Sequence, residues 1–170
     1  MQRRQLIQAG LAGGGLLALG GCATSGTVPS RARVLVIGGG YGGATAAKYL
    51  RLLSDHRIDV VLVEPQASFV SCPISNLVLG GTRSLADVTS SYDALSSRHG
   101  VKLVRDSAAA IDAAAKTVTL ASGSTIRYDK LVLSPGIELM FDSVQGLREA
   151  HAAGRILQAW KAGPETLALR

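Results

Sequence analysis

The sequence predicts an α/β fold built on a parallel sheet, and three observations carry this prediction. Apolar runs at 34–37, 58–63 and 131–133 have the length and β-branched content of strands that are buried on both faces. A glycine-rich turn follows the first run, and helical periodicity follows the turn at 44–53. The order strand, turn, helix, strand defines a βαβ unit, whose crossover is right-handed.

The first predicted helix, at 44–53, carries its apolar residues at helical spacing. These are Ala44, Ala47, Leu50 and Leu53. Lys48 and Arg51 fall on the other side of the helix, which we expect to face water.

The later segments carry weaker signals. We expect a loop at 69–81, a helix at 85–98 anchored by Tyr92 and Leu95, a strand at 101–104, a hairpin at 116–128 and a helix at 151–160. Ser122-Gly123 lies at the centre of the hairpin and supplies its turn.

The turn at 38–43 reads Gly-Gly-Gly-Tyr-Gly-Gly and fits G-x-G-x-x-G, between a strand and a helix as in Rossmann-like dinucleotide-binding domains. Gly38 permits the tight turn, Gly40 lets a pyrophosphate approach the backbone, and Gly43 lets the helix pack close to the strand. Gly42 belongs to the same cofactor-binding turn, whose N–H groups favour phosphate charge. Tyr41 either shields the phosphates or faces solvent.

Glu64 stands at the end of the second strand, about 20 residues after the glycine turn. A carboxylate at this place accepts hydrogen bonds from a ribose diol and repels a 2′-phosphate. We therefore expect FAD or NAD rather than NADP, and we assign Glu64 and the adjacent Pro65 to the cofactor-binding residues.

Residues 1–32 are predicted to be an export signal and linker. Arg3 and Arg4 precede an apolar stretch, Leu6 to Leu19, that is too short to span a membrane as a mature helix. The segment resembles a twin-arginine signal, which predicts a periplasmic protein. Cys22 follows Leu19-Gly20-Gly21 as in a lipoprotein cleavage site, so it either carries a lipid anchor or is incidental. An uncleaved membrane anchor is the third alternative.

The composition argues against several other functions. The net charge is +6 but the basic residues do not cluster, so we expect no nucleic-acid partner. His56, His99 and His151 lie in polar contexts without ligand spacing, so we expect solvated side chains and no metal site. Trp160 is interpreted as a packing anchor.

The most specific stretch is Phe69 to Gly81 (FVSCPISNLVLGG), which resembles the flavoprotein subunit of flavocytochrome c sulfide dehydrogenase. The resemblance continues at 38–49 (GGGYGGATAAKY), 106–108, 128–139 and 159–163 (AWKAG), and so covers nearly all of 33–170. Together these motifs are specific to the group of pyridine nucleotide-disulfide oxidoreductases that contains the sulfide dehydrogenases and sulfide:quinone oxidoreductases.

The resemblance implies that FAD is the cofactor and that Cys72 is joined to the flavin 8α-methyl group by a thioether. It also implies a three-stranded β-meander before a flavin-contacting strand end. The further cofactor-binding residues implied are Asn76, Ala108, Ser134, Pro135 and Gly136. A buried free Cys72 and an ordinary Pro-Gly turn at 135–136 are the alternatives. We expect an FAD-binding domain at 33–145 and, at 146–170, the start of a connection to a second domain.

The same resemblance implies sulfide oxidation, with electrons passing through FAD to a c-type cytochrome subunit. In that family sulfide attacks a redox-active disulfide whose cysteines lie beyond the last matching segment. We therefore expect a chain that ends at Arg170 to lack catalytic residues and to be inactive alone. The alternatives are a sulfide:quinone or NADH-type oxidoreductase with non-covalent FAD, and a truncated dinucleotide-binding module without catalysis.

Overall fold

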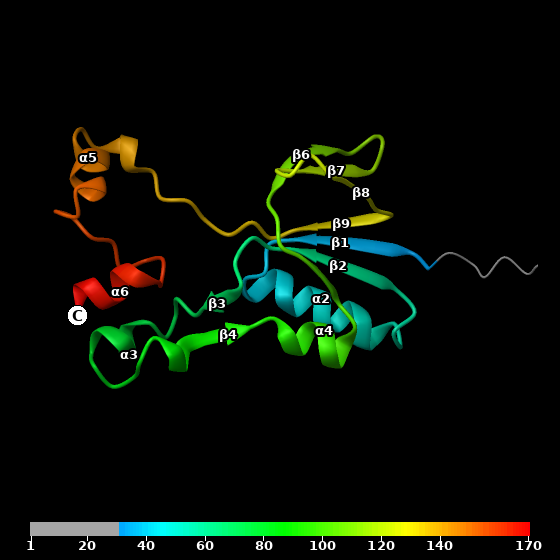
Figure 1. Ribbon diagram of the computed structural model, residues 1–170, viewed down its shortest axis with the longest axis horizontal. Helices are drawn as coiled ribbons and strands as arrows, with labels where there is room; N and C mark the ends of the chain where they lie inside the picture. Colours follow the sequence, from blue (N-terminus) through cyan, green and yellow to red (C-terminus); the bar gives the residue numbers. More distant parts are fainter. Residues whose placement is uncertain (1–30) are drawn as a thin grey trace, which may run out of the picture. The chain divides into compact units, whose positions relative to one another are not determined.

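A four-stranded parallel sheet organises the computed structural model, which describes residues 31–170. Its strands lie in the order β5 (Lys102–Val104), β2 (Asp59–Val63), β1 (Arg33–Ile37) and β9 (Lys130–Leu133) (Figure 1). Every neighbouring pair is parallel, with Val36 facing Leu62 on one side and Val132 on the other. The α/β class and the four strands of this sheet are therefore confirmed. The central strands β1 and β2 are buried on both faces, whereas β5 and β9 form partly exposed edges.

Two helices cover one face of the sheet. Helix α2 (Tyr41–Leu53) packs on β1 and β2 and contacts α4 (Asp93–His99) (Figure 1). Their shared core includes Ala47 and Tyr92, with Leu95 packed against it. The expected anchors of the second helix are thus confirmed, whereas Leu53, at 83% exposure, lies outside the apolar face assigned to it.

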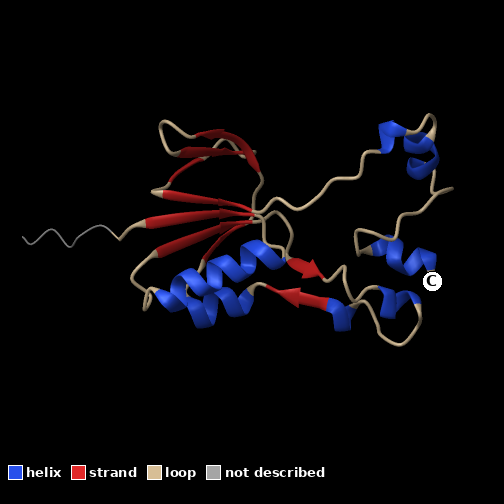
Figure 2. Ribbon diagram, turned by 180° about the vertical axis from the view of Figure 1, so that it is seen from behind, coloured by secondary structure: helices blue, strands red, loops and turns tan. Residues whose placement is uncertain are grey.

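A three-stranded antiparallel meander covers the other face. It consists of β6 (Ala108–Asp112), β7 (Thr117–Leu120) and β8 (Thr125–Arg127). Val118 and Leu120 are buried against Leu35 and Val61 of the sheet. Figure 2 shows the sheet between this meander and the two helices. The hairpin with its Ser122-Gly123 turn is confirmed, and β6 completes the meander that the family resemblance implies.

The segment between β2 and β5 departs from the prediction. The expected loop at 69–81 contains β3 (Ser68–Val70) and α3 (Asn76–Leu79). The expected helix at 85–98 divides into a 3-10 turn, η1 (Ala86–Val88), strand β4 (Thr89–Ser91) and α4. Strand β4 pairs antiparallel with β3, because Ser and Thr compete poorly for helix positions and extended partners are available.

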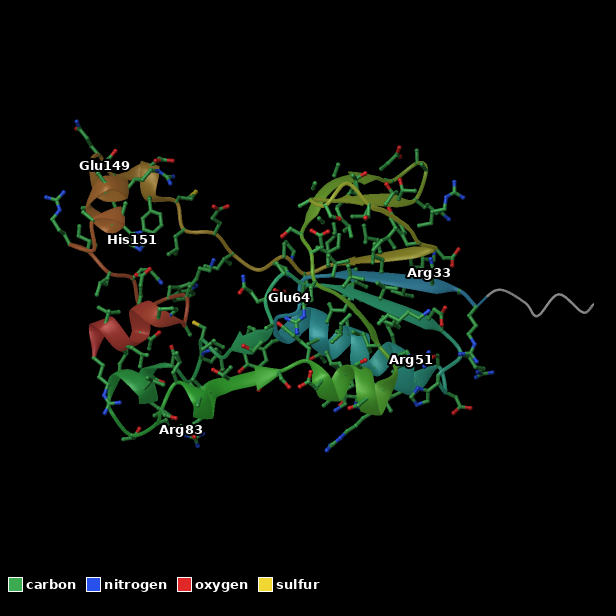
Figure 3. All side chains as sticks on the ribbon, in the orientation of Figure 1. Arg33, Arg51, Glu64, Arg83, Glu149 and His151 are labelled. Carbon is green, nitrogen blue, oxygen red and sulfur yellow. The ribbon has the colours of Figure 1, made fainter. Side chains whose placement is uncertain are left out.

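Arg51 also contradicts its expected exposure. Its side chain is buried under the C-terminal half of α2 (Figure 3). The guanidinium donates hydrogen bonds to the carbonyl oxygens of His99 (2.8 Å), His56 (2.9 Å) and Ile58. These carbonyls belong to the last residue of α4 and to the segment that follows α2, so the charge is satisfied by backbone oxygens instead of water.

The last segment contains a 3-10 turn, η2 (Phe141–Ser143), and helices α5 (Leu147–Ala152) and α6 (Pro164–Leu169). The helix expected at 151–160 is wrong, because the chain leaves α5 through Gly154 in the left-handed region at φ +67°. Within 31–170 no helix combines the length and apolar character of a membrane span. The export signal and Cys22 lie outside the described residues.

Candidate functional site

The glycine turn joins β1 to α2 at the carboxyl end of the sheet. Gly38 adopts φ +94°, and a Cβ there would lie 2.0 Å from the Ser134 carbonyl oxygen. A Cβ on Gly43 would lie 1.8 Å from the Gly38 carbonyl oxygen. Gly40 differs, because the atom nearest its Cβ position is a Phe69 ring carbon at 3.7 Å. Close packing therefore requires glycine at 38 and 43, as expected, and the backbone at Gly40 is open to a ligand.

Glu64 follows β2 and caps the turn. Its carboxylate accepts hydrogen bonds from the backbone N–H of Gly39 (2.7 Å) and of Gln66 (2.8 Å). Figure 3 shows Glu64 at this end of the sheet. The carboxylate is thus fixed on the backbone of the turn that precedes α2, where a ribose next to the phosphates is expected.

Tyr92 forms the floor below the turn. A Cβ on Gly39 would lie 2.6 Å from the Tyr92 hydroxyl oxygen, so only glycine fits above the ring. Burial and the Glu64 carboxylate raise the pKa of Tyr92 to about 12, although the Arg105 guanidinium opposes this shift. The hydroxyl therefore stays neutral and can act as a hydrogen-bond donor throughout the physiological pH range. Sequence reasoning identified Tyr92 only as a packing anchor, because its contact with Gly39 depends on tertiary structure.

Cys72 lies directly beyond β3, half-buried, with a free thiol. The thiol donates a hydrogen bond to the Trp160 carbonyl oxygen. The Cys72 carbonyl accepts hydrogen bonds from the Ser75 N–H (3.0 Å) and hydroxyl (2.8 Å). Its backbone is therefore fixed by a local turn, while its sulfur faces the loop at 157–163.

A cavity of about 520 Å³ brings most of the predicted site together. Its lining combines the glycine turn, the end of β2, the Cys72 loop, the end of β9 and the Trp160 loop. The predicted residues among them are Gly38, Gly40, Glu64, Cys72, Ser134, Pro135 and Gly136. Gly136 adopts φ +80° with nothing within 4 Å of its Cβ position, so the chain turns after β9 in a conformation that favours glycine.

Five predicted residues lie outside this lining. Gly42 and Gly43 lie behind the turn against Ser134, and Pro65 is exposed beside Glu64. Asn76 begins α3 on an exposed face, and Ala108 packs in the meander core. The structure does not place Asn76 or Ala108 in the cavity, and their contacts with a cofactor stay predictions.

The loop at 157–163 closes one side of the cavity and is tied to α5 and α6. Glu165 accepts hydrogen bonds from the Gln158 N–H (2.9 Å) and pairs with His151 (2.9 Å), whose ring stacks on Phe141. His151 is therefore a structural partner and not the solvated residue expected. Trp160 is 67% exposed, so its expected role as a packing anchor is wrong, since the loop uses its carbonyl and not its ring.

These features fit FAD. An open backbone at Gly40 suits a pyrophosphate, the Glu64 carboxylate suits a ribose diol, and Cys72 lies in the same cavity. Gly136 adds no side chain to the strand end that lines the cavity, and the space around its Cβ position is open.

Comparisons with known proteins agree with this assignment. The sequence model of the pyridine nucleotide-disulphide oxidoreductase family matches residues 32–165. The flavoprotein chain of flavocytochrome c sulfide dehydrogenase from Chlorobaculum thiosulfatiphilum is 63% identical over 46 residues, which are 27% of this chain and 94% of that sequence. The sulfide-quinone reductase of Aquifex aeolicus is 35% identical over 109 residues, 64% of this chain and 25% of its own length.

The X-ray structure of the sulfide:quinone oxidoreductase from Aquifex aeolicus superposes with a TM-score of 0.68 at 29% identity. The matched region covers 81% of this chain and 30% of that one, so the chain spans under a third of the sulfide:quinone relatives it matches. The chain belongs to the pyridine nucleotide-disulphide oxidoreductase family of FAD-dependent oxidoreductases, in the group of the sulfide dehydrogenases and sulfide:quinone oxidoreductases.

Proposed function

We propose that the protein containing this chain is a periplasmic sulfide dehydrogenase of the flavocytochrome c type, with FAD attached covalently to Cys72. The observation that carries the proposal is the position of the Cys72 thiol in the cavity that also contains the glycine turn and Glu64. FAD would then be held at its pyrophosphate and ribose by the glycine turn and Glu64, and at its flavin ring by the bond to Cys72.

The chain's own residues have three tasks in this proposal. The start of α2 and Gly40 hold the pyrophosphate by backbone N–H groups, and Glu64 accepts hydrogen bonds from the ribose. Ser134-Pro135-Gly136 and the loop at 157–163 enclose the ring system and limit the access of water. Bound FAD would supply two-electron oxidation with release of single electrons.

The covalent step conserves atoms and electrons. The Cys72 sulfur replaces one hydrogen of the 8α-methyl carbon, so the thiol hydrogen and one methyl hydrogen leave as two protons and two electrons. Dioxygen is the acceptor that we assign, and hydrogen peroxide is the second product. With FAD bound, hydrosulfide would lose one proton and two electrons to become zero-valent sulfur, and FAD would supply the two-electron oxidation. A c-type cytochrome partner would accept these electrons.

Acid precipitation of the holoprotein tests the attachment. We expect a yellow pellet from the natural protein and a colourless pellet with a yellow supernatant from Cys72→Ser. Ser96→Ala, on the exposed surface of α4 and outside the cavity lining, is the control and should keep its flavin in the pellet. Free flavin released from the natural protein would refute the thioether.

The sulfide:quinone relatives favour a second candidate, in which FAD is bound without a covalent bond and quinone is the acceptor. The relative from Dictyostelium discoideum matches over 69% of this chain, further than the sulfide dehydrogenase match extends. Sulfide-dependent reduction of a short-chain quinone, with no reduction of cytochrome c and with extractable flavin, would identify this candidate.

Export and membrane attachment are proposed from the first 32 residues, together with the domain limits at 33–145 and 146–170. Fractionation of cells should find the protein outside the cytoplasm, and replacement of Arg3 and Arg4 by lysine should retain it inside. Incorporation of labelled fatty acid that is lost in Cys22→Ala would establish a lipid anchor.

A further inference from the structure

The Tyr41 hydroxyl connects the glycine turn to the cysteine loop. Tyr41 begins α2, directly after the turn, and its hydroxyl shares a 2.5 Å hydrogen bond with the Ser71 hydroxyl. Its ring stands edge-on to Phe69 of β3, with ring centroids 4.9 Å apart. Ser71 is buried and immediately precedes Cys72. The first residue of α2, the helix whose start is expected to face phosphate, is thus hydrogen-bonded to Ser71, the residue before the Cys72 thiol.

Apart from the contact of the Cys72 thiol with the Trp160 carbonyl, the other anchors of this loop lie in the β3–β4 pair and the turn that follows it. The Ser71 N–H donates to the Val88 carbonyl at 2.8 Å, which extends the β3–β4 pairing by one residue. The Cys72 carbonyl is held by Ser75. These bonds fix the shape of the loop but not its position relative to the glycine turn. Tyr41 supplies that position through one hydrogen bond and one aromatic contact.

We propose that Tyr41 is a positioning residue for covalent flavin attachment, acting through Ser71 on Cys72. The inference rests on the proposed function, in which the cofactor is held at the glycine turn and at the Cys72 thiol. The protein between these two points then sets how often the sulfur lies within bonding distance of the methyl carbon. Small errors in such positioning lower reaction rates strongly.

The rate of attachment measures this role directly. Apoprotein from a flavin-starved host is mixed with FAD, and covalent flavin is followed by the fluorescence of the denatured protein band. We expect Tyr41→Phe and Ser71→Ala each to slow attachment about fivefold, the effect of one net hydrogen bond of average strength. The double variant should be no slower than either single variant, because both remove the same bond. Ser71→Thr keeps a hydroxyl and should restore the rate.

Tyr49→Phe is the matched control, since Tyr49 lies on the same helix with its ring beside Lys48 instead of Ser71. It should attach flavin at the natural rate, and all rates are compared at saturating FAD so that a change in affinity for FAD does not enter them. Natural attachment rates in both Tyr41→Phe and Ser71→Ala, or purely additive losses in the double variant, would overturn the inference. If the natural protein attaches no flavin, the proposed thioether fails and this inference fails with it, which the natural protein's own time course reveals.

Discussion

Replacing Gly43 by alanine tests the contact between the start of α2 and the end of β1. The new methyl carbon would lie 1.8 Å from the Gly38 carbonyl oxygen and 3.3 Å from the Ser134 Cβ. Real Cβ contacts essentially never fall below 3.0 Å, so the helix must move by roughly 1 Å. Because the obstructing atom belongs to the backbone, we expect a loss near the upper end of the overpacking range, about 3 kcal/mol.

Thermal unfolding of the apoprotein measures this loss, with Gly42→Ala as control. A loss of about 3 kcal/mol corresponds to a melting temperature lowered by roughly 6–12 °C for a domain of this size. At Gly42 the methyl carbon meets only the Ser134 hydroxyl, at 2.9 Å, and this side chain can rotate away. Both variants gain the same helix propensity, so their difference isolates the clash. Equal melting temperatures for the two variants would refute the close-packing argument.

Three further outcomes are expected. Arg51→Met removes the donor to the carbonyls of His56, Ile58 and His99. Urea titration should show an unfolding free energy lower by about 3 kcal/mol or more, because three partly buried carbonyls lose their partner. A loss below about 1 kcal/mol would contradict the structural role of Arg51. Glu64→Gln keeps the side-chain shape but loses the charge, so FAD should bind about tenfold more weakly in calorimetric titration, and an unchanged Kd would exclude the ribose assignment. The hydrogen bond from the Gln158 N–H, and after it the contact with His151, hold the pKa of Glu165 below its usual value of 4.5. The ionised carboxylate therefore stabilises the loop at 157–163 above pH 4.5, and this stabilisation is lost as the pH falls through the lowered pKa. Trp160 fluorescence should show this release on acidification, and Glu165→Gln should abolish the transition.

The sheet could be predicted because its signal is local. Val34 to Ile37 and Val60 to Val63 are buried on both faces, so their sequence alone requires a strand. Strands β4 and β6 lack this property. Thr89 to Ser91 is polar, and Ala108 to Ala110 has the composition of a helix, so each becomes a strand only through a neighbouring strand.

The site divides in the same way. The glycine turn and Glu64 were predictable because backbone geometry and one strand end determine them within about 30 residues. The contacts of Arg51, Tyr92 and Trp160 depend on segments distant in sequence, and no periodicity carries that information. The cysteine segment was recognised by resemblance, but its bond to Tyr41 was not.

The thiol contact has a consequence for the loop at 157–163. In the free thiol, Cys72 donates its hydrogen to the Trp160 carbonyl. A thioether sulfur has no hydrogen to donate, so attachment of FAD would remove this bond and leave the loop held by the Gln158–Glu165 and Gln158–Lys161 contacts. The loop would then have one fewer tie to the cysteine in the loaded protein than in the apoprotein. Trp160 is the one tryptophan in this sequence. Its fluorescence therefore comes from the residue whose carbonyl loses the Cys72 hydrogen bond when FAD is attached, and it should differ between the apoprotein and the loaded protein.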